Sequence, residues 1–360
     1  MRCFSFLSAA TLAATALAQT HTDCNPLTRD GCPVMPALGS NATFYFNKTM
    51  SDSIWNITAG GVDWTQKGAT FTIASRGQSP TVKSNFYILF GRVSVIMKSA
   101  RGTGIVSSFI LQSEDLDEID WEFLGANTTH VLTNYFGKGN TTDFSRGKEF
   151  KSDPPQEGFH NYTIDWTKDK TEWWLDGTLL RTLKFGEALG GKNYPQTPMT
   201  VRMGSWAGGD TKNNDPGVVA WAGGETNFKD GPFIMTVQEL YVEDYTSGKE
   251  YQWGDRSGSW ESIKVVEGTS EAMKEILKPH GVTNHWTTLS KGAKVAILAS
   301  IGGVVAIGLI VLSFCCVKQR RAGRREYLAH EAIMTKEAAE LLHYKNQMAQ
   351  GKFGHGSHMI

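Results

Sequence analysis

The chain has 360 residues, and its 36 Lys plus Arg balance its 36 Asp plus Glu, so the formal net charge is zero. Without a basic excess, it lacks the electrostatic signature of a nucleic-acid-binding protein. Its length allows a large core, and its 38 glycines and 11 tryptophans favour loop-rich β structure over a helical bundle.

Residues 1–18 have the pattern of a secretory signal. Arg2 is followed by a run of small and apolar residues that ends in Ala16-Leu17-Ala18. This is an A-x-A cleavage site, so we expect the segment to be removed before Gln19. The alternative is a buried N-terminal helix.

Two features fit an oxidising, secreted environment. Cys24 and Cys32 are the only cysteines between the signal and the apolar run near the C-terminus, so we expect them to form a disulfide. Six N-x-T sequons predict a glycoprotein. Their asparagines are Asn41, Asn47, Asn56, Asn127, Asn140 and Asn161.

Short alternating runs separated by Gly, Asn and Asp extend from about residue 42 to residue 245. Such runs predict β-strands. The clearest are ATFTIAS (69–75), RVSVIM (92–97), NYTIDW (161–166), TEWWL (171–175) and FIMTVQELYVE (233–243). Asp176-Gly177 predicts a two-residue hairpin turn. Many short strands without an internal repeat predict an all-β antiparallel sandwich or barrel.

The stretch LDEIDWEFLG (116–125) places three carboxylates on one face of a predicted strand. Its period-two alternation directs Ile119, Trp121 and Phe123 to one face. The other face carries Glu118, Asp120 and Glu122. A solvated face that resists edge aggregation is one interpretation.

The functional interpretation is acid–base chemistry on a glycosidic bond. A retaining glycosidase needs two carboxyl groups only about 5–5.5 Å apart, one as nucleophile and one as proton donor. Long side chains at positions 118 and 122 can lean together on a twisted sheet, while Asp120 bonds a neighbouring Glu and shifts its pKa.

The motif Asp117-Glu-Ile-Asp-Trp-Glu122 resembles the E-x-D-x-E signature of glycoside hydrolase family 16. That resemblance implies a concanavalin-like β-jelly roll. It also implies that Glu118 is the nucleophile, Asp120 the helper and Glu122 the proton donor and base. Other motifs in the family's order are 104–109, 133–137, 159–162, 174–177 and 194–199.

Within that family, the cysteine pair and the stretch MGSWAGGD (203–210) resemble the fungal CRH transglycosylases of the cell wall. The closer resemblance covers about residues 20–265. It implies a chitin donor, a β-glucan or chitin acceptor, and some chitin hydrolysis. The substrate-binding residues that it implies are Glu122, Asn134, Tyr135, Arg202, Trp206, Gly217 and Trp221. Gly217 offers only backbone, and the Gly-rich surroundings of Trp206 and Trp221 favour exposed platforms.

The C-terminal third predicts membrane attachment. We expect the catalytic domain to span 19–265, with a frayed end from 254, and a juxtamembrane spacer to span 266–294, with a short helix at 271–277. Residues 295–317 carry no charge and are long enough to cross a bilayer. Basic residues follow, so the tail, 318–360, is expected to be cytoplasmic. A lipid-anchor signal is the alternative, but such a signal would end in its apolar run.

Smaller features of this region are open. Cys315 and Cys316 are candidates for palmitoylation or for plain packing. Met334, Ala338 and Leu341 recur at helical spacing in the tail, which indicates a partner-binding helix or an ordinary surface helix.

Two rival functions are a membrane-anchored lectin on the same fold and a plain endo-β-glucanase. A lectin would not need two glutamates at i and i+4. The resemblance implies no cofactor and no metal, and we expect His160 to be structural because the carboxylates already supply both roles. The predicted location is the cell surface and wall, with a single-pass membrane anchor.

Overall fold

The computed structural model describes residues 22–142, 145–278, 286 and 289–350. The predicted signal, residues 1–18, lies outside these residues. The chain divides after Lys278 into two units, and each is described by itself.

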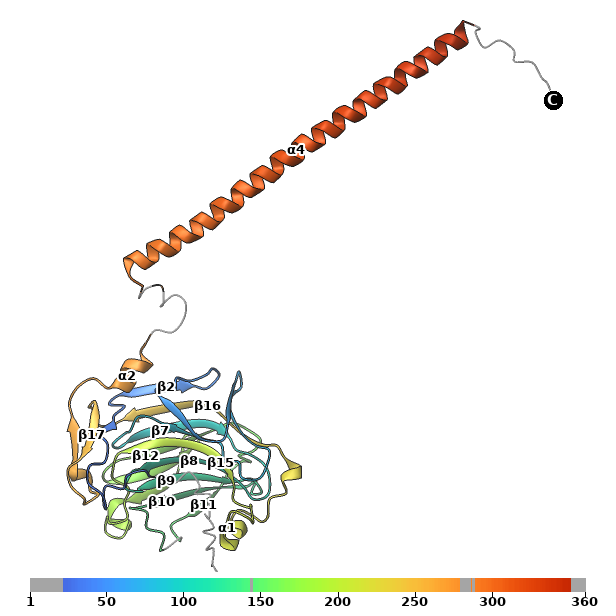
Figure 1. Cartoon of the computed structure of the whole chain (residues 1–360). Coiled ribbons are helices and arrows are strands. Elements are labelled where there is room, and N and C mark those ends of the chain that lie inside the picture. The colour runs from blue at the N-terminus through green and yellow to red at the C-terminus, as the bar shows by residue number, and fades with distance from the viewer. Residues whose placement is uncertain (1–21, 143–144, 279–285, 287–288, 351–360) are drawn as a thin grey trace, which may run out of the picture. The chain divides into compact units, whose positions relative to one another are not determined.

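Two antiparallel sheets packed face to face make up most of the first unit (Figure 1). Among the described residues, the front sheet has seven strands in the spatial order β11-β10-β9-β8-β15-β6-β3. These strands are β3 (Trp55–Ala59), β6 (Thr81–Ser84), β8 (Ile105–Ser113), β9 (Glu118–Leu124), β10 (His130–Phe136), β11 (Lys148–Lys151) and β15 (Met199–Ala207).

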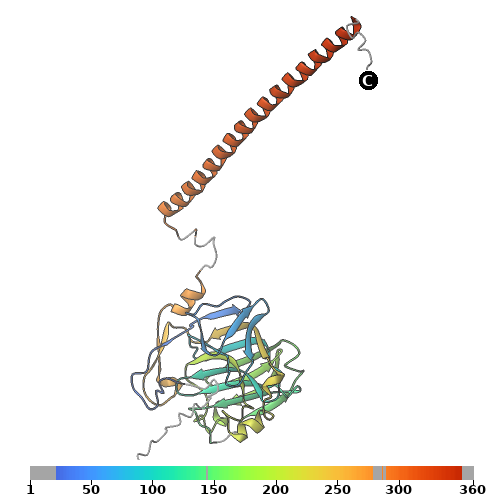
Figure 2. The ribbon, with the colours of Figure 1, turned by 45° about the vertical axis from the view of Figure 1, so that its right-hand side comes forward.

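The back sheet has eight strands within the described part of the chain. Its order is β14-β13-β12-β7-β16-β5-β4, with β2 pairing beside β16. The strands are β2 (Asn41–Tyr45), β4 (Val62–Thr65), β5 (Gly68–Ile73), β7 (Gly91–Lys98), β12 (His160–Trp166), β13 (Lys170–Leu175), β14 (Thr178–Lys184) and β16 (Phe233–Asp244). Figure 2 shows the same two layers turned by 45°. The predicted all-β jelly-roll sandwich is confirmed.

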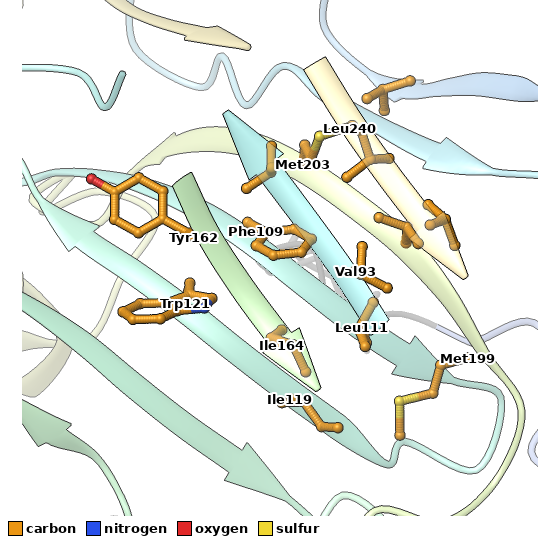
Figure 3. Close-up of a cluster of buried hydrophobic side chains, with 14 of the residues drawn as sticks. Val93, Phe109, Leu111, Ile119, Trp121, Tyr162, Ile164, Met199, Met203 and Leu240 are labelled. Atoms are coloured by element: carbon orange, nitrogen blue, oxygen red, sulfur yellow. The ribbon is translucent and has the colours of Figure 1, made fainter. Parts of the chain in front are cut away.

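The core fills the space between the two sheets. Figure 3 shows Phe109, Ile119 and Trp121 of the front sheet beside Tyr162 and Ile164 of the back sheet, and all five are fully or almost fully buried. Trp121 and Tyr162 meet edge to face, with ring centroids 5.4 Å apart. The odd-numbered side chains of β9 therefore face the core, as the alternation predicted.

The five runs predicted as strands correspond to β5, β7, β12, β13 and β16, with ends that differ by at most two residues. The predicted hairpin joins β13 to β14. Asp176 and Gly177 have φ values of 48° and 81°, which a primed two-residue turn requires.

A small third sheet corrects the predicted frayed end of the domain. It pairs β1 (Met35–Pro36), β17 (Glu250–Trp253) and β18 (Ile263–Val266). The sequence between β17 and β18 is irregular, but pairing with β17 orders the chain up to Val266. The short helices of the unit are η1 (Phe185–Glu187), α1 (Pro216–Trp221), η2 (Phe228–Asp230), η3 (Trp260–Ser262) and α2 (Glu271–Ile276).

Specific contacts hold both ends of the first unit. Near the N-terminus, Thr22 Oγ1 donates to Glu114 Oε2 at 2.6 Å, and a disulfide closes a short local loop. Cys24 and Cys32 form the predicted disulfide, with their Cα atoms 5.6 Å apart. At the other end, α2 matches the short helix predicted there, but it packs on the core through Ala272 rather than standing in a free spacer. Its N-cap, Ser270, accepts a hydrogen bond from Met273 N and donates one to Ala37 O. The compact unit thus extends past the predicted boundary at 265.

The second unit contains the long helix α4 (Lys291–Ala349), whose 59 residues correspond to about 88 Å at the usual rise per residue. By length and composition it can cross a membrane, and the predicted span 295–317 lies within it. The helix continues without a break through the described part of the predicted tail.

We expect Trp121→Ala to lower the free energy of unfolding by about 3–5 kcal/mol, because it empties a fully buried site between the sheets. Urea denaturation of a soluble version that ends at Lys278 would measure it. Leu179→Ala, at an exposed position, is the control and should change stability by less than about 0.5 kcal/mol. Equal losses in the two variants would contradict this assignment of the core.

Candidate active site

Strand β9 carries the three carboxylates on the face of the front sheet that points away from the core. The Glu118 residue is 7% exposed, Asp120 is 1% exposed and Glu122 is partly exposed. The side chains between them are fully buried. The three carboxylates are therefore largely covered by neighbouring residues and do not lie on an open, solvated sheet face.

The neighbouring strands decide what touches each carboxylate. Residues directly opposite each other in a sheet share a face. Gln112 of β8 lies opposite Glu118, and its Nε2 donates to Glu118 Oε2 at 2.7 Å. Asn134 of β10 lies opposite Asp120. Ser108 and Leu132 lie on the two sides of position 122.

Burial and mutual repulsion shift the protonation of two of these groups. Burial, and then the charge of Glu118, raises the pKa of Glu122 to about 8. Burial also raises the pKa of Asp120 well above its usual range, and the two glutamates add to that shift. At neutral pH both groups are therefore mainly protonated, and Asp120 hydrogen-bonds Glu118.

The back sheet holds β9 in place through two indole groups. Trp173 Nε1 donates to the backbone carbonyl of Asp120 at 3.0 Å, and Trp121 Nε1 donates to Thr163 O at 3.3 Å. Both bonds are buried, where competition from water is absent. They fix the position of β9 relative to the back sheet at the residues between the two glutamates.

A buried polar cluster holds the start of β9, and no sequence pattern indicated it. Asp117 precedes Glu118 and accepts hydrogen bonds from Lys138 N at 2.9 Å, Gln196 N at 2.8 Å and Thr197 Oγ1 at 3.0 Å. These donors come from two loops far apart in the sequence, so one carboxylate ties three chain segments together. The contact between Gln112 and Glu118 could not be predicted from the sequence either, because these residues face each other only once β8 and β9 are paired.

Arg202 lies on the same face and is 4% exposed. It is opposite Ile110 of β8 and Lys83 of β6, and its Nε donates to Thr200 Oγ1 at 3.2 Å. Burial lowers its pKa, while the charges of Glu114 and Glu118 oppose that shift. A buried cation beside a carboxylate suits a site that grips polar sugar groups.

The two predicted aromatic platforms form one pair instead. Trp206 of β15 and Trp221 of α1 stack with ring centroids 6.1 Å apart and 21° between their planes. Trp206 packs on a small apolar cluster that includes Val106 and Leu132, so only part of its ring is accessible. Trp221 is 38% exposed and offers the open ring face. Gly217, in the first turn of α1, is exposed, and a Cβ there would meet nothing within 4 Å.

The structure separates two neighbours that the resemblance placed together. Asn134 is partly exposed beside Asp120, as a cleft residue would be. Tyr135 lies opposite Ile119 and belongs to the core cluster. The prediction that Tyr135 lines the cleft is wrong, because adjacent residues of a strand point to opposite faces.

His160 lies on the back sheet, away from the carboxylates, and its Nδ1 is 2.7 Å from Asp176 Oδ2 in the neighbouring hairpin turn. This is a structural contact. Within the described residues, no group of three or more His, Cys, Asp or Glu side chains is arranged to hold a metal ion.

Comparisons with known proteins find clear relatives of this chain. Residues 48–223 match the sequence model of Glycosyl hydrolases family 16. The chain is 51% identical to a Crh-like protein of Arthroderma benhamiae, over 94% of this chain and 93% of that protein. It is 49% identical to Crh-like protein 2 of Botryotinia fuckeliana, over 92% of this chain and 74% of that one. A solved structure of Crh5 transglycosylase in complex with NAG has a TM-score of 0.65 at 48% identity, covering 67% of this chain and 99% of that chain.

We expect Glu122→Gln to stabilise the fold increasingly as pH rises from about 5 to about 8. The folded pKa of Glu122 is about 8, against an ordinary value of 4.5. Above the ordinary value the unfolded carboxyl ionises while the folded one resists ionisation, so the wild-type protein loses stability as pH rises. Glutamine does not ionise, so the variant does not lose stability in this way as pH rises.

The measurement is the difference in urea midpoint between Glu122→Gln and wild type at the two pH values, in the soluble version that ends at Lys278. The free energy of unfolding that Glu122→Gln gains over wild type should be at least about 1 kcal/mol larger at pH 8 than at pH 5. Glu239→Gln, on the back sheet, is the control. A difference that stays constant with pH would show that the fold does not perturb this carboxyl.

Proposed function

Because the chain belongs to glycoside hydrolase family 16, we propose that it is a cell-wall transglycosylase that cleaves chitin and joins the freed end to β-glucan. Hydrolysis of chitin is the minor side reaction. The observation that carries this proposal is the carboxylate row of β9. It places an acid with a raised pKa and a hydrogen-bonded carboxylate on one face of one strand.

In the first step, Glu118 attacks the anomeric carbon of the donor sugar. Gln112 and the protonated Asp120 donate hydrogen bonds to its carboxylate, which keeps it oriented. Glu122 gives its proton to the glycosidic oxygen as the carbon–oxygen bond breaks. The products are a glycosyl ester on Glu118 and a free chain end that leaves the cleft.

In the second step, the ionised Glu122 takes a proton from an acceptor hydroxyl. The acceptor oxygen attacks the anomeric carbon, and the ester bond to Glu118 breaks. Two inversions at one carbon retain its configuration. Water as acceptor gives hydrolysis, and a glucan hydroxyl gives the cross-link.

The donor chain lies on the side of β9 where β15 and α1 bring Arg202 and the two tryptophans together. The open face of Trp221 suits the apolar CH face of a sugar ring. Arg202 offers buried donors, and Gly217 leaves the backbone of α1 accessible. The comparison that supports an N-acetylglucosamine-based donor is the Crh5 transglycosylase complex with NAG. Asn134 lines the acceptor side.

The similarity to Crh5 transglycosylase, at 48% identity, supports transfer over hydrolysis, and this separates the proposal from a plain endo-β-glucanase. A lectin would not need an acid with a raised pKa beside a second carboxylate. Helix α4 supports a membrane anchor that holds the enzyme at the cell surface, with the glycosylated catalytic domain outside.

Glu118→Gln should abolish the joining of labelled chitin oligomers to β-glucan, with a loss of at least about 1,000-fold, because the amide cannot form the ester intermediate. Chromatography that detects the label in the joined product measures the reaction. Glu239→Gln should retain parental activity. Transfer by Glu118→Gln at the parental rate would exclude the assigned nucleophile.

Trp221→Ala should raise KM for chitin oligomers by about 3- to 10-fold with little change in kcat, because one exposed stacking face is worth about 0.5–1.5 kcal/mol. Initial rates over a range of donor concentrations measure both constants. Tyr45→Ala removes an exposed ring from the back sheet and should leave KM unchanged. An unchanged KM in Trp221→Ala would remove this ring from the donor site.

A further inference from the structure

One row of cross-strand neighbours runs across the front sheet and ends at a sequon. Each member is directly opposite the next in the strand pairing. The row consists of Asn134, Asp120, Ile110, Arg202, Lys83 and Asn56. Directly opposed residues share a face, so Asn56 is on the face that carries the carboxylates.

Strand direction sets the direction of the cleft. The two glutamates act on opposite sides of one glycosidic linkage, and they are four residues apart along β9. The polysaccharide must therefore cross the strands and follow the row from position 134 to position 56. Four strand spacings separate Asp120 from Asn56, or about 19 Å.

Asn56 lies at the end of the row where the donor chain is proposed to bind. Arg202 and the tryptophan pair are on the β15 side of the carboxylates, and β6 and β3 follow β15 in the sheet. β3 is the outermost strand there, and Asn56 and Thr58 of its sequon are both exposed. A donor chain long enough to cross β6 therefore meets position 56.

The other five sequon asparagines, all within the described residues, lie off the strands of the front sheet. Asn41 and Asn161 are on strands of the back sheet, and Asn47 follows β2. Asn127 and Asn140 are in loops at the two ends of β10, and the Nδ2 of Asn140 donates to Asn193 Oδ1 at 3.2 Å. Position 56 is the one of the six that lies on the cleft row.

We propose that an N-linked glycan on Asn56 closes the donor end of the cleft and limits how far a chitin chain can extend past β6. This inference rests on the proposed transglycosylase function. In the secretory pathway, Asn56 Nδ2 loses a proton and bonds to the anomeric carbon of a lipid-diphosphate-linked oligosaccharide, and the lipid diphosphate leaves. The attached sugars are bulky and hydrated, and they occupy the surface beside Lys83.

The test compares the full chain, expressed in a glycosylating eukaryotic host and purified from its membranes in detergent, with Asn56→Gln and with Thr58→Ala, which removes the sequon but keeps the asparagine. Thr58→Ser, which keeps the sequon, and Asn47→Gln, which removes a glycan from the back-sheet side, are the controls. Glycopeptide mass spectrometry measures occupancy at position 56. Transfer to labelled glucan is measured with the shortest chitin oligomer that the parent uses and with colloidal chitin.

We expect position 56 to be glycosylated in the parent. The two sequon-removing variants should raise the rate on colloidal chitin relative to the short oligomer by at least about threefold, and the controls should keep the parental ratio. An unoccupied Asn56, or a ratio that is unchanged or lower in both variants, overturns the inference while transfer itself continues. A parent that transfers neither donor overturns the proposed function, and this inference with it.

Discussion

The alternation along β9 is the constraint on which the rest of the site depends. Its odd-numbered side chains are locked in the core between two sheets, so its even-numbered side chains have only one face available to them. A slip of one residue in its pairing would bury the carboxylates between the sheets and expose Trp121. The indole of Trp173 bonds the carbonyl of Asp120 and opposes such a slip.

The cost of this arrangement is electrostatic, and the fold supplies the compensation elsewhere. Three acids on one strand repel each other, and burial strengthens that repulsion. Protonation relieves it, because Asp120 and Glu122 remain neutral while Glu118 is held by Gln112. The stability that the acidic face forfeits is offset by the large core beneath it and by the anchors of Asp117 at the start of the strand. The closeness of the three carboxylates therefore both destabilises the fold and raises the pKa values of Asp120 and Glu122.

The local parts of this fold and site could be predicted from the sequence. The two faces of β9, the Asp176-Gly177 turn and the cysteine pair depend on residues close together in the chain. What could not be predicted depends on pairing between distant segments. The four residues of β18 join a sheet only by pairing with β17, and the mutual stacking of Trp206 and Trp221 needs β15 and α1 to meet. Tyr135 adjoins Asn134 in a motif that the resemblance assigns to the cleft, but alternation along β10 directs Tyr135 into the core.

A sheet also explains how one surface can hold both chemistry and recognition. Along a strand, same-face residues are about 6.5–7 Å apart, which suits groups that must meet on one sugar. Across the sheet, each step along the row reaches a residue of a different strand, so the row from Asn134 to Asn56 contains one residue from each of six strands. In the proposed mechanism, catalysis is concentrated in a single short motif, whereas the proposed limit on substrate length depends on residues that no local motif connects. The outermost strand, β3, is where such a row must stop, and the glycan proposed there would also oppose pairing of this edge with another sheet.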